Sequence, residues 1–260
     1  MPTLIELPSV DANFALCREL GLRFVEVNMN LPQYQAEVFP LRECRAWACD
    51  HGLGITIHLD ENLSVCDFNP LVAGAYTDTV LRAIEIAQLL SATVVTMHLS
   101  DGVYFTLPDR RVFLFEAYND AYMTALIRFR DRCTAAIGAS GLSICVENCG
   151  CFLKFQRHAI EALLKSPVFG LTYDIGHDHT AGCADEAFIL SNTNKLRHMH
   201  IHDATRTQNH LILGDGEIDI EAKLDIARRR RCGCVVEAKT AEGLRRSVAY
   251  LAAAIQPQPE

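Results

Sequence analysis

The chain has 260 residues, half of them apolar, and a formal net charge of -8 at pH 7. Such a chain can bury one large core, and its length is usual for a single α/β barrel domain. The acidic balance provides no basic field for holding a phosphate backbone, so we expect no nucleic-acid partner.

The sequence also bears on membranes and compartment. No apolar run approaches the roughly 20 residues needed to cross a bilayer, so no membrane association is expected. The first residues, MPTLIELPSV, lack the basic, apolar and cleavage-site order of a signal peptide. The 11 cysteines are scattered and odd in number, which is typical of free thiols in a reducing compartment. We therefore predict a cytoplasmic protein.

In chain order, short apolar runs alternate with longer amphipathic segments. The eight predicted strands cover residues 4–7, 23–29, 54–59, 93–99, 142–147, 170–175, 196–202 and 234–238. The predicted helices cover residues 12–20, 41–51, 71–90, 115–137, 159–164, 220–229 and 241–254. Repeated strand and helix without a linker predicts an α/β fold, a single (β/α)8 TIM barrel over residues 1–260. An open doubly wound sheet would carry a Gly-rich loop after its first strand, where this chain reads LPSVDAN.

Side chains alternate along each predicted strand, and one face of most strands carries a polar group near the C-terminal end. These polar residues are Glu26, Asn28, His58, His98, Glu147, Asp174, His200 and Glu237. The apolar face must pack under the helices, so the polar face points into the barrel, at the mouth where barrel enzymes keep their active sites. Burying several carboxylates together without a cation would cost several kcal/mol each. The pattern therefore indicates a divalent metal site.

Five short motifs carry a resemblance to a known family. They are Val146-Glu147-Asn148, Asp174-Ile175-Gly176-His177, His200-Ile201-His202-Asp203, Gly214-Asp215-Gly216-Glu217 and Val235-Val236-Glu237. With these motifs in this order, the chain resembles the xylose isomerase-like barrels, which include sugar-phosphate isomerases and epimerases, ketose 3-epimerases and endonuclease IV. The resemblance implies one divalent metal ion held by Glu147, Asp174, His200 and Glu237. Such a hard site suits Mn²⁺ or Mg²⁺, with Zn²⁺ as the alternative.

The resemblance also implies a reaction. A sugar or sugar phosphate (polyol or inosose) that chelates the ion has its α C–H acidified, because the metal stabilises the developing enediolate. Glu147 and Glu237 are the expected catalytic groups, one removing a proton and the other returning it. We therefore expect a metal-dependent isomerase or epimerase with a small-molecule carbohydrate as its partner. The choice between isomerisation and epimerisation, the sugar and the presence of a homo-oligomer stay open.

A second group of residues is expected to bind substrate: His58, His98, His177, Arg206 and His210. Instead of binding substrate, His177 could orient another group of the site. Arg206 could instead lie on the surface without a substrate contact. Residues 101–109 provide either aromatic contacts over the mouth or a simple connection.

Two other functions are weighed. His58, His98 and His210 match metal positions of endonuclease IV, which suggests a metal-dependent phosphodiester hydrolase, but Gln208 stands where that enzyme has a metal-binding Asp. This chain also departs from the ketose 3-epimerase pattern, because it has Leu153 where those enzymes have a second Glu. A non-catalytic binding protein on the same scaffold would be expected to lose ligands, yet all four remain here.

Overall fold

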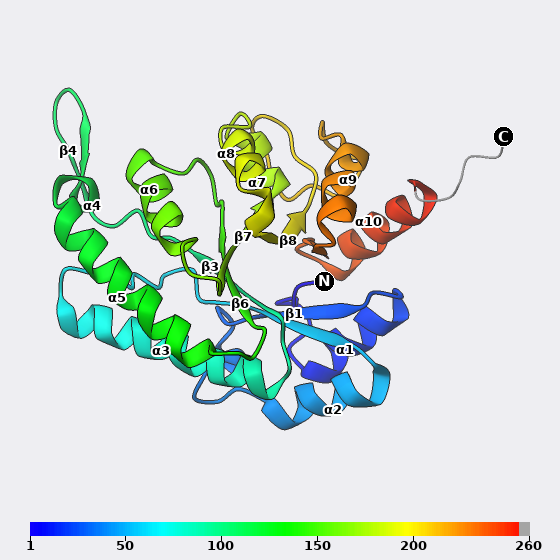
Figure 1. The fold of residues 1–260 in the computed structure, drawn as a ribbon. Coiled ribbons are helices and arrows are strands. Elements are labelled where there is room, and N and C mark those ends of the chain that lie inside the picture. The colour runs from blue at the N-terminus through cyan, green and yellow to red at the C-terminus, as the bar shows by residue number, and fades with distance from the viewer. Residues whose placement is uncertain (255–260) are drawn as a thin grey trace.

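The computed structural model describes residues 1–254 and contains one curved parallel sheet with helices packed outside it (Figure 1). Its seven strands pair in the order β1-β2-β3-β6-β7-β8-β9. Their bounds are Phe24–Asn28 (β1), Gly54–His58 (β2), Val94–His98 (β3), Ser143–Glu147 (β6), Phe169–Asp174 (β7), Leu196–Ile201 (β8) and Gly233–Val236 (β9). Since all neighbours are parallel and follow chain order, the architecture is that of a (β/α)8 barrel, as predicted.

The first three residues extend the sheet on the outer side of β1, where Pro2 forms a parallel bridge with Glu26. Thr3 N donates to Glu26 O at 2.9 Å, and Glu26 N donates to Met1 O at 2.8 Å, so the N-terminus lies along β1 (Figure 1). The predicted strand at residues 4–7 is wrong. There the backbone turns, because Asn13 of the following helix binds it: Leu4 N donates to Asn13 Oδ1 at 2.8 Å, and Asn13 Nδ2 donates to Leu7 O at 2.6 Å.

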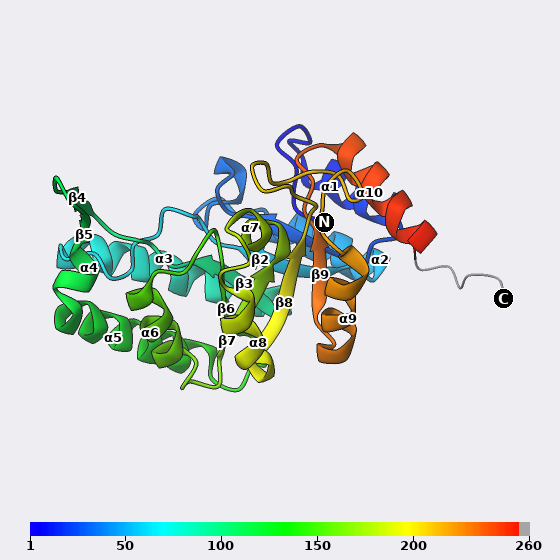
Figure 2. The same ribbon diagram turned by 90° about the horizontal axis from the view of Figure 1, so that it is seen from above.

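Helices cover the outside of the strands when the molecule is seen from the side and from above (Figures 1 and 2). They are α1 Val10–Glu19, α2 Leu41–His51, α3 Pro70–Leu89, α4 Leu114–Ala117, α5 Asn119–Ile137, α6 Lys154–Leu163, α7 Ile175–Thr180, α8 Glu186–Ser191, α9 Ile220–Arg230 and α10 Ala241–Ala254. Short 3₁₀ turns occupy Pro32–Tyr34 and Thr193–Lys195. Within residues 1–254, no helix has the length and apolar character needed to cross a bilayer.

Two helical predictions need correction. The segment at 115–137 is not one helix, because Tyr118 adopts φ -113° and ψ 46° and separates α4 from α5. The short helices α7 and α8 were not predicted. Helix α7 begins directly after β7 because the Asp174 side chain accepts a hydrogen bond from His177 N at 2.7 Å. One carboxylate thereby ends the strand and caps the helix.

The segment at residues 101–109 contains the first strand of a small antiparallel hairpin, β4 Tyr104–Thr106 with β5 Arg111–Phe113. The hairpin projects from one end of the molecule (Figure 1). Its side chains do not line the cavity at the barrel mouth described below, so this segment does not cover the mouth.

Strand register decides which polar residues become neighbours. His98 of β3 pairs with Glu147 of β6, and Asp174 of β7 pairs with His200 of β8. The outward residues of the same strands, such as Val146 and Tyr173, are fully buried under the helices. The alternation predicted from the sequence is therefore present, and it brings the polar groups to one end of the barrel.

Candidate active site

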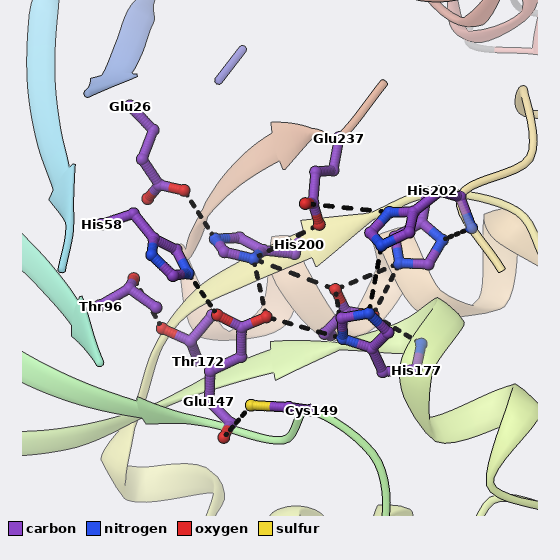
Figure 3. A network of polar contacts seen from close by, with 12 residues as sticks. Glu26, His58, Thr96, Glu147, Cys149, Thr172, His177, His200, His202 and Glu237 are labelled. Carbon is purple, nitrogen blue, oxygen red and sulfur yellow. Dashed lines mark hydrogen bonds and ion pairs between the residues drawn. The ribbon is translucent and has the colours of Figure 1, made fainter. Parts of the chain in front are cut away.

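Four side chains from four strand ends converge on one point at the C-terminal mouth. The ligating atoms of Glu147, Asp174, His200 and Glu237 all lie within 4.8 Å of one another. From His200 Nδ1, the nearest carboxylate oxygens of Glu147, Glu237 and Asp174 lie at 3.1, 3.7 and 4.0 Å (Figure 3). Glu237 was predicted to lie within a strand at 234–238, but β9 ends at Val236 and Glu237 follows it directly. The structure thus brings together the four residues predicted as ligands.

The donor set fits a divalent cation. It consists of three carboxylates and one imidazole nitrogen, which is a hard, mostly oxygen site. Buried polar atoms without a hydrogen-bond partner also gather around it, among them His98 Nε2, His177 Nδ1, His210 Nδ1 and Glu237 Oε2. Buried polar atoms are normally paired, so these groups are arranged for a charged or polar guest.

The two glutamates differ in their surroundings. Burial raises the pKa of the Glu147 carboxyl, but His200, His58 and His98 outweigh burial and hold that pKa well below its usual range. Burial raises the pKa of Glu237. His200 opposes this rise, the charges of Asp174 and Glu147 add to it, and the net pKa is raised. Environments that push two facing carboxyls in opposite directions are typical of acid and base partners.

His58 and His98 lie against one oxygen of Glu147. His58 Nε2 is 3.1 Å and His98 Nε2 is 3.4 Å from Glu147 Oε2, while the other oxygen of this carboxylate faces His200. Both carboxylate oxygens of Glu147 therefore face imidazole nitrogens. Burial opposes the charged form of His58, but Glu147 raises the pKa of His58 to about 9.

Three further imidazoles form a cluster beside Asp174, and the nitrogens of His177, His202 and His210 lie within 4.8 Å of one another. His177 Nε2 is 3.3 Å from His210 Nε2, and the His210 ring stacks on His202 at 4.1 Å between centroids. His202 Nδ1 accepts the backbone N–H of His210 at 2.8 Å, and His202 Nε2 lies 3.0 Å from Asp174 Oδ1. His202 therefore orients Asp174.

His202 and Glu26 were not among the predicted site residues. His202 stood third on the polar face of the run at 198–202, and Glu26 stood on the polar face of the first barrel strand. Both signals were present in the sequence, but only the contacts show what these two residues hold. Lys239 was missed as well; its Nζ lies 3.4 Å from Glu237 Oε1, and no strand pattern indicates it.

The loop after β8 is held by Asp203, which is 1 % exposed. Its carboxylate accepts backbone N–H groups of Ala204, Gly214, Gly216 and Ile218 at 2.9 to 3.1 Å. A Cβ on Gly216 would lie 2.3 Å from Asp203 Oδ1. The Gly214-Asp215-Gly216-Glu217 motif is therefore explained by the close approach of this loop to a buried carboxylate.

A cavity of about 270 Å³ opens above the four converging residues. Its walls include the predicted residues Glu147, Glu237, His58, His98, His177 and His210. Asp174 and His200 are buried beside them. Arg206 is the exception: it is exposed, its guanidinium lies near Gly182, and it does not line the cavity. The position of this side chain depends on the loop after β8, which no strand alternation predicts.

Comparison with known proteins supports the architecture. Residues 14–254 match the sequence model of the family described as xylose isomerase-like TIM barrel. No curated protein matches the chain.

Solved structures share the fold at low sequence identity. A D-tagatose 3-epimerase-like protein is 20 % identical with a TM-score of 0.78, over 97 % of this chain and 95 % of that one. The 3-keto-D-glucoside 4-epimerase YcjR from E. coli is 16 % identical with a TM-score of 0.76, over 97 % and 98 %. An IOLI protein solved with a zinc atom is 14 % identical with a TM-score of 0.70, over 97 % and 92 %. At these identities the likeness concerns the fold.

Proposed function

Because the chain belongs to the xylose isomerase-like TIM barrel family, we propose that it is a divalent-metal-dependent isomerase or epimerase of a sugar or sugar phosphate (polyol or inosose). The observation that carries this proposal is the convergence of three carboxylates and one imidazole within 4.8 Å. The fold neighbours named as a D-tagatose 3-epimerase-like protein and a 3-keto-D-glucoside 4-epimerase support the substrate class.

Glu147, Asp174, His200 and Glu237 would hold the ion. His200 would use Nδ1, the nitrogen that faces the carboxylates. Mn²⁺ or Mg²⁺ suits the three carboxylates, and Zn²⁺ suits the imidazole; a zinc atom accompanies the IOLI structure. A bound divalent cation supplies a Lewis acid that stabilises negative charge on two adjacent sugar oxygens.

The two glutamates would move the proton. Glu147 ends β6 and Glu237 follows β9, so their carboxyls approach a bound sugar from different parts of the barrel wall. One removes the proton on the carbon next to the carbonyl and the other returns it. Return to the opposite face of the same carbon is epimerisation. Return to the neighbouring carbon, with transfer of the hydroxyl proton from one oxygen to the other, is isomerisation.

The imidazoles of His58, His98, His177 and His210 would position the substrate. His58, His98, His177 and His210 line the cavity above the ligands, where ring nitrogens can bind sugar hydroxyls. Arg206 would contact the substrate only after moving from its exposed position near Gly182.

A second candidate function rests on the histidines around Glu147. His58 and His98 both approach Glu147 Oε2, so a second ion could share that carboxylate, as a phosphodiester hydrolase acting on abasic DNA would require. Assaying the metal-loaded protein on a panel of ketoses, aldoses and inososes beside an abasic duplex separates the two. We expect sugar turnover and an intact duplex; duplex cleavage without sugar turnover would favour the hydrolase. Tight sugar binding without turnover would instead favour a binding protein.

A further inference from the structure

A second cavity, of about 470 Å³, lies at the opposite, N-terminal mouth of the barrel. It exists because the first inward-facing positions of three strands are small: Gly54 in β2, Ser143 in β6 and Gly233 in β9. Barrel interiors normally carry bulky branched side chains in such layers. The turns that follow α1, α3, α5 and α9 form the rim.

The rim of this cavity is cationic. Arg23, Arg197 and Arg231 line it, and no Asp or Glu does. Among residues 1–254, none of these three guanidinium groups lies within 4.0 Å of a carboxylate, whereas Arg132 and Arg245 pair with Asp78 and Glu19. Arg197 donates to the carbonyls of Asn194 and Leu196 through Nη1, which leaves its other nitrogens free to bind. Three unpaired arginines around one cavity are unexpected in a chain of net charge -8.

The floor of the cavity is a buried imidazole. His198 is 1 % exposed and lines the cavity. Its Nε2 lies 3.0 Å from Glu26 Oε2, and within the described part of the chain its Nδ1 has no hydrogen-bond partner. This nitrogen lies on the side of Gly233, since a Cβ there would be 3.4 Å away. The Nδ1 atom of His198 is therefore available to a ligand bound between the arginines.

From these features we propose that the N-terminal mouth is a second binding site, for a small phosphate-bearing anion. Guanidinium groups bind phosphate oxygens through parallel N–H donors, and no carboxylate on the walls opposes the negative charge. The cavity is larger than one phosphate needs, so the esterified phosphate of a small metabolite fits the space. This site contains none of the four proposed metal ligands, although His198 contacts Glu26, which in turn contacts His200. It does not depend on the proposed function.

The alternative role for the arginines is to neutralise helix ends. The C-termini of α1, α3, α5 and α9 point toward this mouth and carry partial negative charge. Arg229, in the last turn of α9, could serve that role without lining the cavity. It is therefore a charge-matched control for Arg231.

The test is calorimetric titration with inorganic phosphate and with a hexose 6-phosphate, on the metal-loaded and the chelated protein. We expect one saturable site for each anion on the chelated protein, and the same site for inorganic phosphate on the metal-loaded protein. Arg197 is bound to backbone carbonyls, so Arg23 and Arg231 should be changed together in the variant R23Q/R231Q. This variant should weaken Kd at least tenfold, and R229Q should leave Kd unchanged. Should the pair fold poorly, R23Q alone tests the same site. Tighter binding of the hexose phosphate identifies an ester as the ligand, and equal binding identifies free phosphate.

Three results would overturn the proposal. One is the absence of binding up to about 10 mM of either anion, because a site built for phosphate should bind with higher affinity than that. Another is binding that disappears on chelation and survives in R23Q/R231Q, because that anion sits at the metal end. The third is an equal loss in R229Q, which would show a general charge effect.

Discussion

The Nε2 atom of His200 lies 2.8 Å from Oε1 of Glu26, on the side of the ring opposite the carboxylate cluster. The contact is an ion-pair approach rather than an aligned hydrogen bond. Glu26 is itself held by His198 Nε2 at 3.0 Å and by the Thr56 hydroxyl, which donates at 3.1 Å. Burial raises the pKa of Glu26, but His200 and His198 outweigh it and the net pKa is well below its usual range. An ionised Glu26 therefore favours a proton on Nε2, so Nδ1 is the nitrogen that would bind a metal ion.

Glu26→Gln should weaken divalent-metal affinity by about 10- to 100-fold, because a carboxylate behind a ligating imidazole fixes its tautomer and raises its basicity. Competition with a chromophoric chelator measures the affinity directly. Glu61→Gln is the control, since Glu61 lines the same cavity but contacts Asn30 instead of a ligand. Equal affinities for Glu26→Gln and Glu61→Gln would refute the role of Glu26.

Removal of the metal should lower the melting temperature. The three carboxylates converge within 4.8 Å, so without a cation they repel one another, and with it the native state gains binding free energy. Differential scanning calorimetry before and after chelation, with metal content checked by elemental analysis, gives the shift. Asp174→Asn should show a much smaller chelator effect. A wild-type melting temperature that does not move after verified removal would contradict a metal site.

Asp203→Asn should destabilise the fold by about 2 to 3 kcal/mol, since an amide replaces a charged acceptor of backbone N–H groups. The amide NH₂ would face donors from Gly214 and Gly216. Urea unfolding measures the change. Asp219→Asn is the control, because Asp219 caps α9 and Asn is an equally good cap. If both variants lose the same stability, Asp203 is not the clamp of this loop.

Much of the fold and the centre of the site could be predicted because strand alternation is a local property. Period-two patterns identified Glu147, Asp174 and His200 as inward-facing, and parallel strands bring such positions to one mouth. The helix α7 could not be predicted this way, since its start depends on the Asp174 cap, which competes with continuation of the strand.

Contacts across the barrel could not be predicted from the pattern of neighbouring residues in the sequence. Glu26 and His198 are 172 positions apart in the chain, so their pairing depends on how the whole barrel curves. Arg206 was predicted at the site by resemblance, and the path of its loop places it outside the cavity. The N-terminal cavity depends on Gly54 and Gly233, which in the sequence look like ordinary glycines at strand starts.

The most direct test of the proposed function is exchange of substrate hydrogen with solvent. Metal-loaded wild type, incubated in heavy water with each candidate ketose, aldose or inosose, should introduce deuterium at the carbon next to the carbonyl of its substrate, as read by NMR. Glu237→Gln should still bind that sugar but lose turnover and exchange by about 10²- to 10⁴-fold, because it lacks the proton-transfer group. A metal-filled wild type that introduces no deuterium into any of these sugars would contradict the proton-transfer account.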